Sequence, residues 1–246
     1  HAVAVPPPII AEEACRTRQR EERRPGEALP VVVKEYVTPA GTLAQVVRRS
    51  ADYPHARVPL FSDHHVPPTR SVRYLVRGPA DLPVLECILR PPGTDELTAY
   101  RAQARDARRF CDQAGLLLAG NTPGIGDPLM WLSGVEPVLL AAVDDPGFLA
   151  AYVAVVARWN RQVLQINLDA GVDVVVRRGW YESTDFWSPD LYRRFLLEPL
   201  RQEAELAHQA GVRLSYVMNS GSMPLLPCLA DSGIDKDHCA FINVSG

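Results

Sequence analysis

The sequence lacks the features that would place it in a specialised class of protein. Its five cysteines are odd in number, widely scattered and form no CxxC pair, so neither a disulfide framework nor a zinc knuckle is indicated. No apolar run approaches the roughly 20 residues that span a bilayer, and no signal-peptide pattern is present. The formal net charge of −3 gives no electrostatic reason to expect a nucleic-acid partner. These absences favour a soluble globular protein, with a cytoplasmic location as the default.

The beginning and end of the chain are irregular in composition. Three prolines at 6–8 and the charged run RTRQREERR at 16–24 predict an irregular N-terminal segment over residues 1–30. VVVKEYV at 31–37 predicts a strand, and the proline-rich stretch 50–97 predicts loops with short elements. Because the chain starts without Met and stops in the apolar run FINVSG, we expect the predicted fold to be incomplete in this sequence.

A repeated pattern begins at about residue 98. A helical stretch ends in a glycine, and a short apolar run follows at once. The pattern occurs as QAGLLLAG (113–120), DAGVDVVVRRG (169–179), QAGVRLSYVMNSG (209–221) and, less regularly, at 231–246. A left-handed glycine that closes a helix, followed by a buried strand, produces this pattern.

Two helix starts are also marked. Asp145-Pro146 and Ser188-Pro189 each place a capping side chain before a proline at the first helical position. Amphipathic stretches follow both signals, so we predict helices over 146–169 and 189–209.

Alternation of helices and apolar strands predicts an α/β protein with a parallel sheet. The run VVV at 174–176 is apolar on both faces, as in a strand that is covered on both sides. The sheet could be an open doubly wound sheet or a closed barrel. No GxGxxG follows any strand, and NTPGIGDP at 121–128 lacks a phosphate-loop lysine. We therefore expect a (β/α)8 TIM-barrel-like parallel barrel.

Four segments between Val31 and Asp235 carry a family resemblance. They are YVTPAGTL (36–43), SVRYLVRGPADLPVL (71–85), AGNTPGIGDPLMWLSGVEPVLLAAVDDP (119–146) and AGVDVVVRRGWYESTDFWSPDLYRRFLLEPL (170–200). In order and spacing the chain resembles the uroporphyrinogen decarboxylase superfamily, nearer its corrinoid-related methyltransferase-like branch. The resemblance implies one barrel domain over 31–246 and an anionic tetrapyrrole-like or methyl-carrying substrate.

One departure from the family pattern concerns metal binding. The zinc-dependent methyltransferases have a His-x-Cys pair where this sequence has Met218-Asn219-Ser220-Gly221, which offers zinc no imidazole or thiolate. We therefore expect no bound metal and methyl transfer without the usual zinc site. Asp63, His64 and His65 are expected in an exposed loop rather than at a metal.

The resemblance leaves alternatives open. One is cofactor-free decarboxylation of uroporphyrinogen or a related carboxylated compound, and another is a barrel that binds a corrinoid or tetrapyrrole without chemistry. The resemblance implies a corrinoid as substrate or carrier rather than a resident cofactor. A corrinoid protein and a second copy of the chain, as a homodimer, are the macromolecular partners compatible with it.

Catalytic groups of a parallel barrel come from the carboxyl ends of its strands. Arg177 and Arg178 end an apolar strand, and guanidinium groups bind carboxylate or phosphate with paired donors. Because adjacent residues point oppositely, at least one of the two is expected in a structural or surface ion pair. Trp180 and Tyr181 are candidates to stack on a flat ligand or to cover the barrel rim.

The remaining candidates lie on the same loops. Glu182 and Asp185 are candidate proton-transfer groups, with loop solvation or an ion pair to the arginines as the alternative. Asn219 and Ser220 are candidates to donate hydrogen bonds to a developing negative charge, or else to satisfy backbone groups of a turn. Asn121 and Met218, at the ends of their strands, complete the predicted substrate-binding set.

Overall fold

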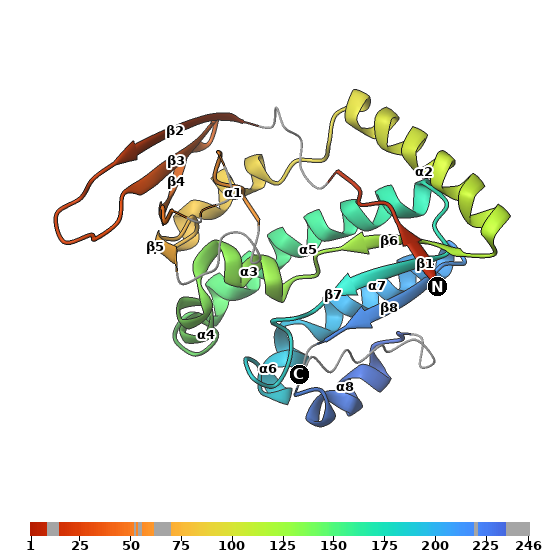
Figure 1. The fold of residues 1–246 in the computed structure, drawn as a ribbon. Helices are drawn as coiled ribbons and strands as arrows, with labels where there is room; N and C mark the ends of the chain where they lie inside the picture. Colours follow the sequence, from red (N-terminus) through yellow and green to blue (C-terminus); the bar gives the residue numbers. More distant parts are fainter. Residues whose placement is uncertain (9–14, 52, 54–55, 62–69, 219–220, 235–246) are drawn as a thin grey trace. The chain divides into compact units, whose positions relative to one another are not determined.

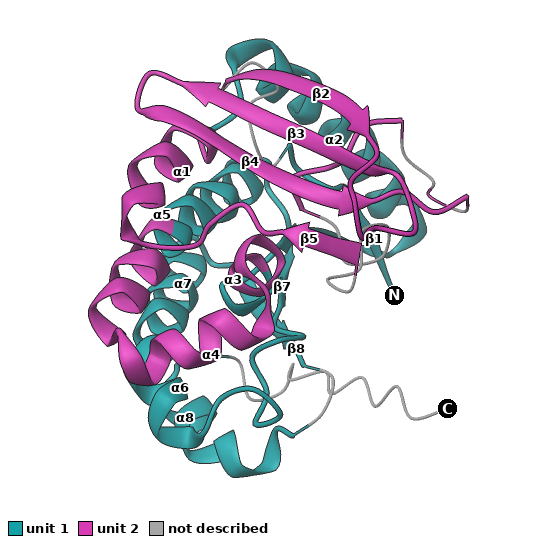
Figure 2. Cartoon of the chain, turned by 90° about the vertical axis from the view of Figure 1, so that its left-hand side faces the viewer, with its two compact units in different colours: residues 1–11, 91–127, 156–246 teal, residues 12–90, 128–155 magenta. Residues whose placement is uncertain are grey.

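The chain folds into two compact units. The computed structural model describes residues 1–8, 15–51, 53, 56–61, 70–218 and 221–234. Unit 1 comprises residues 1–11, 91–127 and 156–246, and unit 2 comprises residues 12–90 and 128–155 (Figure 2). None of the described helices combines the length and hydropathy needed to cross a membrane.

Unit 1 is built of a parallel sheet and helices (Figure 1). Its elements are β1 (Ala2–Ala4), α2 (Thr94–Ala114), β6 (Leu117–Thr122), the start of α3 (Gly126–Ser133), the second half of α5 (Pro146–Asp169), β7 (Val174–Arg178), α6 (Pro189–Phe195), α7 (Leu197–Gln209), β8 (Arg213–Val217), the 3-10 turn η3 (Met223–Leu225) and α8 (Leu226–Asp231). The sheet has the order β1-β6-β7-β8, and all three pairings are parallel.

The sequence pattern from residue 98 onward correctly predicted three strands of this sheet, β6, β7 and β8. Gly115, Gly171 and Gly211 have φ of +65°, +74° and +71°, and each lies between a helix and the strand that follows it. Ser188 caps α6, since its Oγ accepts a hydrogen bond from the backbone N–H of Leu191. The runs that follow the three glycines are adjacent parallel strands, so the α/β class with a parallel sheet is confirmed.

The two faces of the sheet differ in what they carry. Register pairs Thr122 with Arg177 and Arg177 with Tyr216, so these three side chains share one face. Contacts of Arg177 with Glu203 of α7 show that this is the helix-covered face (Figure 1). Arg178 belongs to the opposite face because side chains alternate along a strand.

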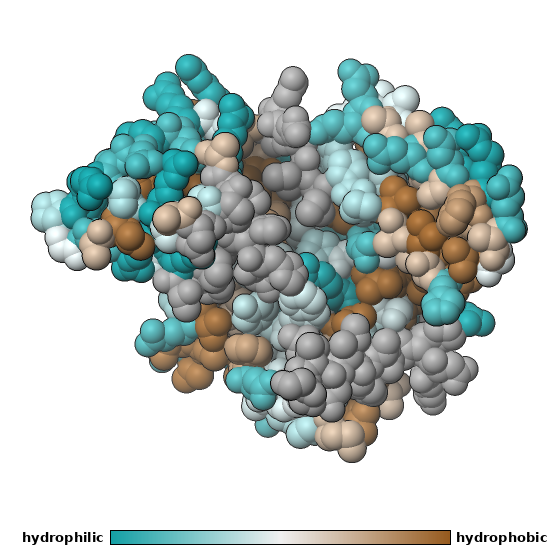
Figure 3. All heavy atoms as spheres, in the orientation of Figure 1, coloured by the Kyte–Doolittle hydropathy of each residue, from teal (hydrophilic) through white to brown (hydrophobic). Residues whose placement is uncertain are grey.

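Unit 2 contains an antiparallel sheet with the order β2-β3-β4-β5. Its elements are β2 (Arg16–Glu22), β3 (Val31–Thr38), β4 (Gly41–Arg48), β5 (Ser71–Arg73), the 3-10 turn η2 (Pro79–Asp81), α1 (Leu82–Ile88), the rest of α3, α4 (Val135–Asp144) and the first half of α5. Valines fill both faces of β3: Val31 and Val33 pack with Val46, and Val32 packs with Val47. Helix α4 exposes Leu140 and Val143. In Figure 3 a brown, hydrophobic patch lies at the lower left, where Figure 1 shows α4.

Several expectations differ from the structure. Residues 1–30, expected to be irregular, contain β1 and β2, and the predicted helix over 189–209 is divided into α6 and α7 at Leu196. Among the described residues β1 and β8 have a neighbour on one side only, so a closed barrel is not shown. The expectation of one barrel domain over 31–246 stays a prediction. The segment predicted after Gly233 and the Asp63–His65 loop lie outside the described residues.

Candidate functional site

The candidate site lies at the carboxyl ends of β6, β7 and β8 in unit 1. Because these strands are parallel neighbours, their trailing segments reach one edge of the sheet: Asn121 is the last residue but one of β6, Arg177 and Arg178 end β7, and Met218 follows β8. Asn219 and Ser220 lie outside the described residues. The sheet therefore brings together the described residues that the sequence selected, and their chemical roles remain predictions.

Arg177 lies in the interior and contacts two carboxylates. Its Nη1 is 2.6 Å from Glu182 Oε2 and its Nε is 2.5 Å from Glu203 Oε2, and all three side chains are 0–1% exposed. Its guanidinium also lies over the ring of Tyr216, 4.8 Å from the centroid. Two charge-assisted contacts between buried groups hold this side chain in one orientation.

Glu182 connects the loop after β7 to the start of α3. Its Oε1 accepts hydrogen bonds from the backbone N–H groups of Ile125 (2.8 Å) and Gly126 (2.7 Å), and its other oxygen accepts from the hydroxyl of Tyr216. Backbone N–H groups at a helix start favour an anion, and here Glu182 supplies it. The glycine-bearing segment NTPGIGDP thus binds a carboxylate of the chain itself.

Close packing explains the glycines of this segment. A Cβ on Gly126 would lie 2.5 Å from Glu182 Cγ, and Gly124, at φ +73°, lies against the backbone carbonyl of Arg178. Gly179 lies equally close to the ring of Tyr216. Side chains larger than hydrogen at these positions would separate the loops after β6 and β7.

Residues from the helices complete the buried cluster, and sequence reasoning missed them. Asn160 of α5 donates to Glu203 Oε1 (2.8 Å) and accepts from the backbone N–H of Gly124 (3.1 Å). Glu203 of α7 lies among the buried residues of that helix, next to Leu200 and Ala204. A carboxylate within the apolar stripe of an amphipathic helix was the signal that could have identified Glu203.

Burial sets the protonation of the cluster. Desolvation raises the pKa of Tyr216, and the charge of Glu182 raises it further, to well above its ordinary value. Desolvation and Glu182 also raise the pKa of Tyr192, whose hydroxyl lies 3.2 Å from that of Tyr216. Desolvation opposes the charge of Arg177, but attraction by Glu182 and Glu203 outweighs it and raises the pKa of Arg177. Both tyrosines are therefore neutral hydrogen-bond donors beside a charged arginine.

Arg178 has a different environment from Arg177. Its Nε lies 3.3 Å from Oδ2 of the buried Asp127, and its guanidinium carbon lies 4.0 Å from the centre of the Trp180 ring. The side chain of Arg178 is 29% exposed. Asp127 also accepts a hydrogen bond from the backbone N–H of Tyr181 (2.9 Å), so one carboxylate orients both the arginine and the aromatic loop.

The other predicted residues have simpler surroundings. The ring of Tyr181 packs on Phe186 at 5.1 Å, and Asp185 is exposed with Oδ2 3.1 Å from Ser183 Oγ. Met218 is buried. The backbone N–H and C=O of Asn121 are both bound by the side-chain amide of Asn167, a fully buried residue that sequence reasoning also missed.

The described residues provide no group of three His, Cys, Asp or Glu side chains arranged to hold a metal ion. The buried carboxylates Glu182 and Glu203 are bound instead by Arg177 and by N–H donors. The arrangement can orient the partly exposed side chain of Arg178 and the ring of Trp180 at the sheet edge, next to the buried cluster around Arg177.

Comparison with known proteins gives little further information. The sequence matches no protein-family profile and no curated protein. One solved structure with a similar arrangement is a methyltransferase from Methanosarcina mazei, with 19% sequence identity and a TM-score of 0.48. The match covers 58% of this chain and 42% of that structure, so the chain spans less than half of its length.

Proposed function

We propose that the carboxyl edge of the unit 1 sheet binds an anionic, flat substrate through Arg178 and Trp180, in an enzyme of the uroporphyrinogen decarboxylase superfamily. The observation that carries this proposal is the Arg178 side chain, which is 29% exposed, lies with its guanidinium carbon 4.0 Å from the centre of the Trp180 ring and is oriented by the buried Asp127. A guanidinium that is already oriented loses less conformational entropy when it binds a carboxylate or phosphate.

The two arginines have different parts in this proposal. Arg177 is neutralised by Glu182 and Glu203 and has no exposed surface, so it positions the loop and does not bind substrate. Glu182 is a positioning residue by the same reasoning, since both of its oxygens accept hydrogen bonds inside the core. Asp185 is the exposed carboxylate of the loop and is the better candidate for proton transfer.

Within the superfamily we favour methyl transfer from or to a tetrapyrrole-like carrier such as a corrinoid. The support is the sequence resemblance to the methyltransferase-like branch, and the absence of His and Cys at 218–221 implies an acceptor other than a zinc-bound thiolate. The decarboxylation alternative would use the arginine pair, Arg177 and Arg178, to bind the carboxylates of the substrate. It loses support because only Arg178 has exposed surface.

Titration of visible absorbance tests the proposal with two probes, cobalamin and uroporphyrin. We expect at least one to bind, and Arg178→Gln to raise its Kd about tenfold through loss of a charge-assisted contact. Trp180→Leu should also weaken binding. The control is Arg193→Gln, because Arg193 is an exposed arginine of α6 that pairs with Asp190 of the same helix.

The outcomes separate the alternatives. An unchanged Kd in Arg178→Gln and Trp180→Leu, or no binding of either probe to the parent protein, would refute the proposed site. Binding that depends on Arg178, with release of CO2 from uroporphyrinogen, would favour the decarboxylase alternative. Binding without product from a methylated corrinoid or from the porphyrinogen would indicate a non-catalytic binding protein.

A further inference from the structure

Unit 2 contains a cavity that the proposed function does not use. Its volume is about 220 Å³, below the roughly 300–1,000 Å³ of pockets for drug-sized ligands. Its apolar walls include Val76, Val138 and Leu149, from the segment before η2, from α4 and from α5. The size suits a small molecule with a compact apolar body.

The two hydroxyl groups that line the cavity, those of Ser133 and Tyr152, already have hydrogen-bond partners within the protein. Phe148 and Tyr152 stack with their rings 20° from parallel and 5.7 Å apart. The hydroxyl of Tyr152 lies 3.1 Å from Ser133 Oγ, and Ser133 donates in turn to the carbonyl of Val76 (2.8 Å). Burial raises the pKa of Tyr152, so its hydroxyl stays protonated. These groups therefore favour the apolar part of a ligand.

Two opposite charges also line the cavity. Arg77 and Asp145 are both exposed residues. The backbone N–H of Arg77 donates a hydrogen bond to Asp81 Oδ2. Within the described part of the chain, the guanidinium of Arg77 has no ion-pair or hydrogen-bond partner, so it is available to a ligand. Asp145 uses one oxygen to cap α5, accepting from the N–H of Phe148 (3.0 Å). A ligand here would meet one cation and one anion.

We propose that this cavity binds a free α-amino acid with an apolar side chain, such as phenylalanine or leucine. Its carboxylate would pair with Arg77, its ammonium group with Asp145, and its side chain would pack against Phe148 and Leu149. A simple carboxylic acid would leave Asp145 facing a like charge, and a simple amine would do the same at Arg77. The zwitterion is the ligand class that satisfies both charges.

Isothermal titration and saturation-transfer NMR of the full chain test this proposal with four probes: L-phenylalanine, L-leucine, 3-phenylpropionate and phenethylamine. We expect one of the two amino acids to bind more tightly than either singly charged probe. Arg77→Gln and Asp145→Asn should each raise its Kd about fivefold, the size expected for a solvent-accessible ion pair. Asn can still cap α5, so the second variant should retain the fold.

Matched controls are Arg73→Gln and Asp144→Asn, exposed residues of unit 2 that do not line the cavity. Ala141→Trp should fill the cavity and abolish binding, and if that variant does not fold, the two charge variants still decide the question. The proposal is overturned if neither amino acid binds, if phenylpropionate or phenethylamine binds as tightly, or if the charge variants bind as the parent does. Because all of these residues belong to unit 2, the result is independent of the substrate titrations at Arg178.

Discussion

The two units use the same pair of residue types, arginine and glutamate, in opposite ways. In unit 1 Arg177 meets Glu182 and Glu203 with essentially no exposed surface, inside a core closed by Asn160 and Tyr216. In unit 2 Arg20 meets Glu35 with 55% and 26% of their side chains exposed, while valines occupy the interior of the sheet. Burial turns an ion pair from a minor surface contact into a requirement of the fold.

The difference has a functional consequence. A core of valines tolerates exchange of one apolar residue for another, whereas a buried charge needs its partners in fixed places. In unit 1 one of those partners, Glu182, belongs to the loop after β7 that also contains Trp180. The buried cluster therefore makes the geometry of the proposed binding site depend on residues that never contact the substrate.

The largest expected effect is that of Arg177→Met. The variant leaves two carboxylates buried without a cation, which should lower the free energy of unfolding by about 3–5 kcal/mol. The matched variant in unit 2 is Arg20→Met, which should lower stability far less because its ion pair with Glu35 is exposed to solvent. Urea titrations followed by far-ultraviolet circular dichroism measure both. Equal losses in the two variants would show that burial does not distinguish the ion pairs of the two units.

A second test concerns the close approach between the loops after β6 and β7. Gly124 and Gly171 have nearly the same φ, +73° and +74°, but a Cβ on Gly124 would meet the carbonyl of Arg178, and one on Gly171 would meet nothing within 4 Å. Alanine in the left-handed conformation costs about 1–2 kcal/mol at either position. Crowding should add about 2 kcal/mol at Gly124 only.

The same urea titrations measure this difference, with Gly171→Ala as the control for backbone strain. If the two alanine variants were equally stable, the loops would not be held together in the way that the buried cluster implies. If Gly124→Ala alone also weakened binding of a probe at Arg178, the link between the cluster and the proposed site would be strengthened.

The helix ends and the parallel strands of unit 1 could be predicted from the sequence because the signals for them are local. A glycine after a helix, as at Gly115, and a serine before proline, as at Ser188, act through the conformation of a few neighbouring residues. Three glycines of this kind, Gly115, Gly171 and Gly211, were enough to predict that β6, β7 and β8 are strands of one parallel sheet. The alternation of side chains also predicted that Arg177 and Arg178 would have different surroundings.

Strand β2 and the buried cluster around Arg177 could not be predicted, because both depend on contacts between residues that are distant in the sequence. β2 has the sequence RTRQREE, with no apolar alternation, and it is a strand because it pairs along its whole length with β3. Glu203 and Asn160 are polar residues on long helices, and only the position of Arg177 makes them members of one cluster. Arg177 is buried and Arg178 is not because α7 covers the face of the sheet to which Arg177 belongs. The local sequence does not show which face that is.

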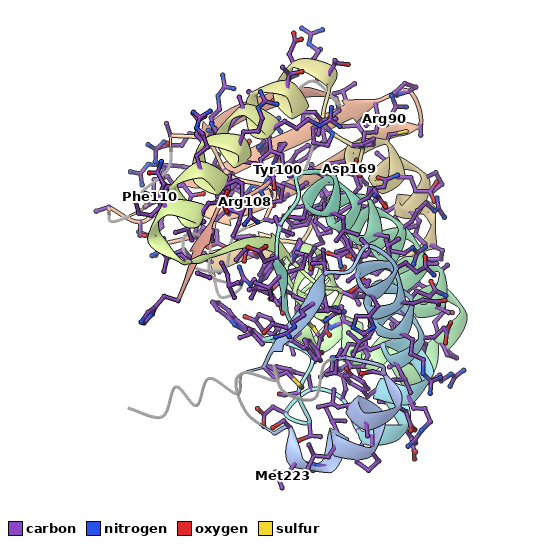
Figure 4. All side chains as sticks on the ribbon, turned by 90° about the vertical axis from the view of Figure 1, so that its right-hand side faces the viewer. Arg90, Tyr100, Arg108, Phe110, Asp169 and Met223 are labelled. Atoms are coloured by element: carbon purple, nitrogen blue, oxygen red, sulfur yellow. The ribbon has the colours of Figure 1, made fainter. Side chains whose placement is uncertain are left out.

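The smallest expected effect is a change in the alkaline stability of unit 1. Tyr100 of α2 (labelled in Figure 4) is buried, and desolvation raises its pKa to about 12. Because the folded pKa lies above the unfolded value of about 10, Tyr100 contributes stability that is complete below pH 10 and is lost as the pH rises toward 12. Tyr100→Phe should therefore make the fall in stability between about pH 10 and 12 shallower.

At pH 7 the same variant should change stability by less than about 1 kcal/mol. The hydroxyl of Tyr100 donates one long hydrogen bond, 3.3 Å, to Asn167 Oδ1, and that oxygen still accepts from the backbone N–H of Asn121 when the hydroxyl is removed. Urea midpoints measured from pH 7 to pH 11.5 in parent and variant give the two slopes. Parallel curves would mean that Tyr100 ionises as freely in the folded protein as in the unfolded chain, and that the interior of unit 1 near Asn167 is open to water.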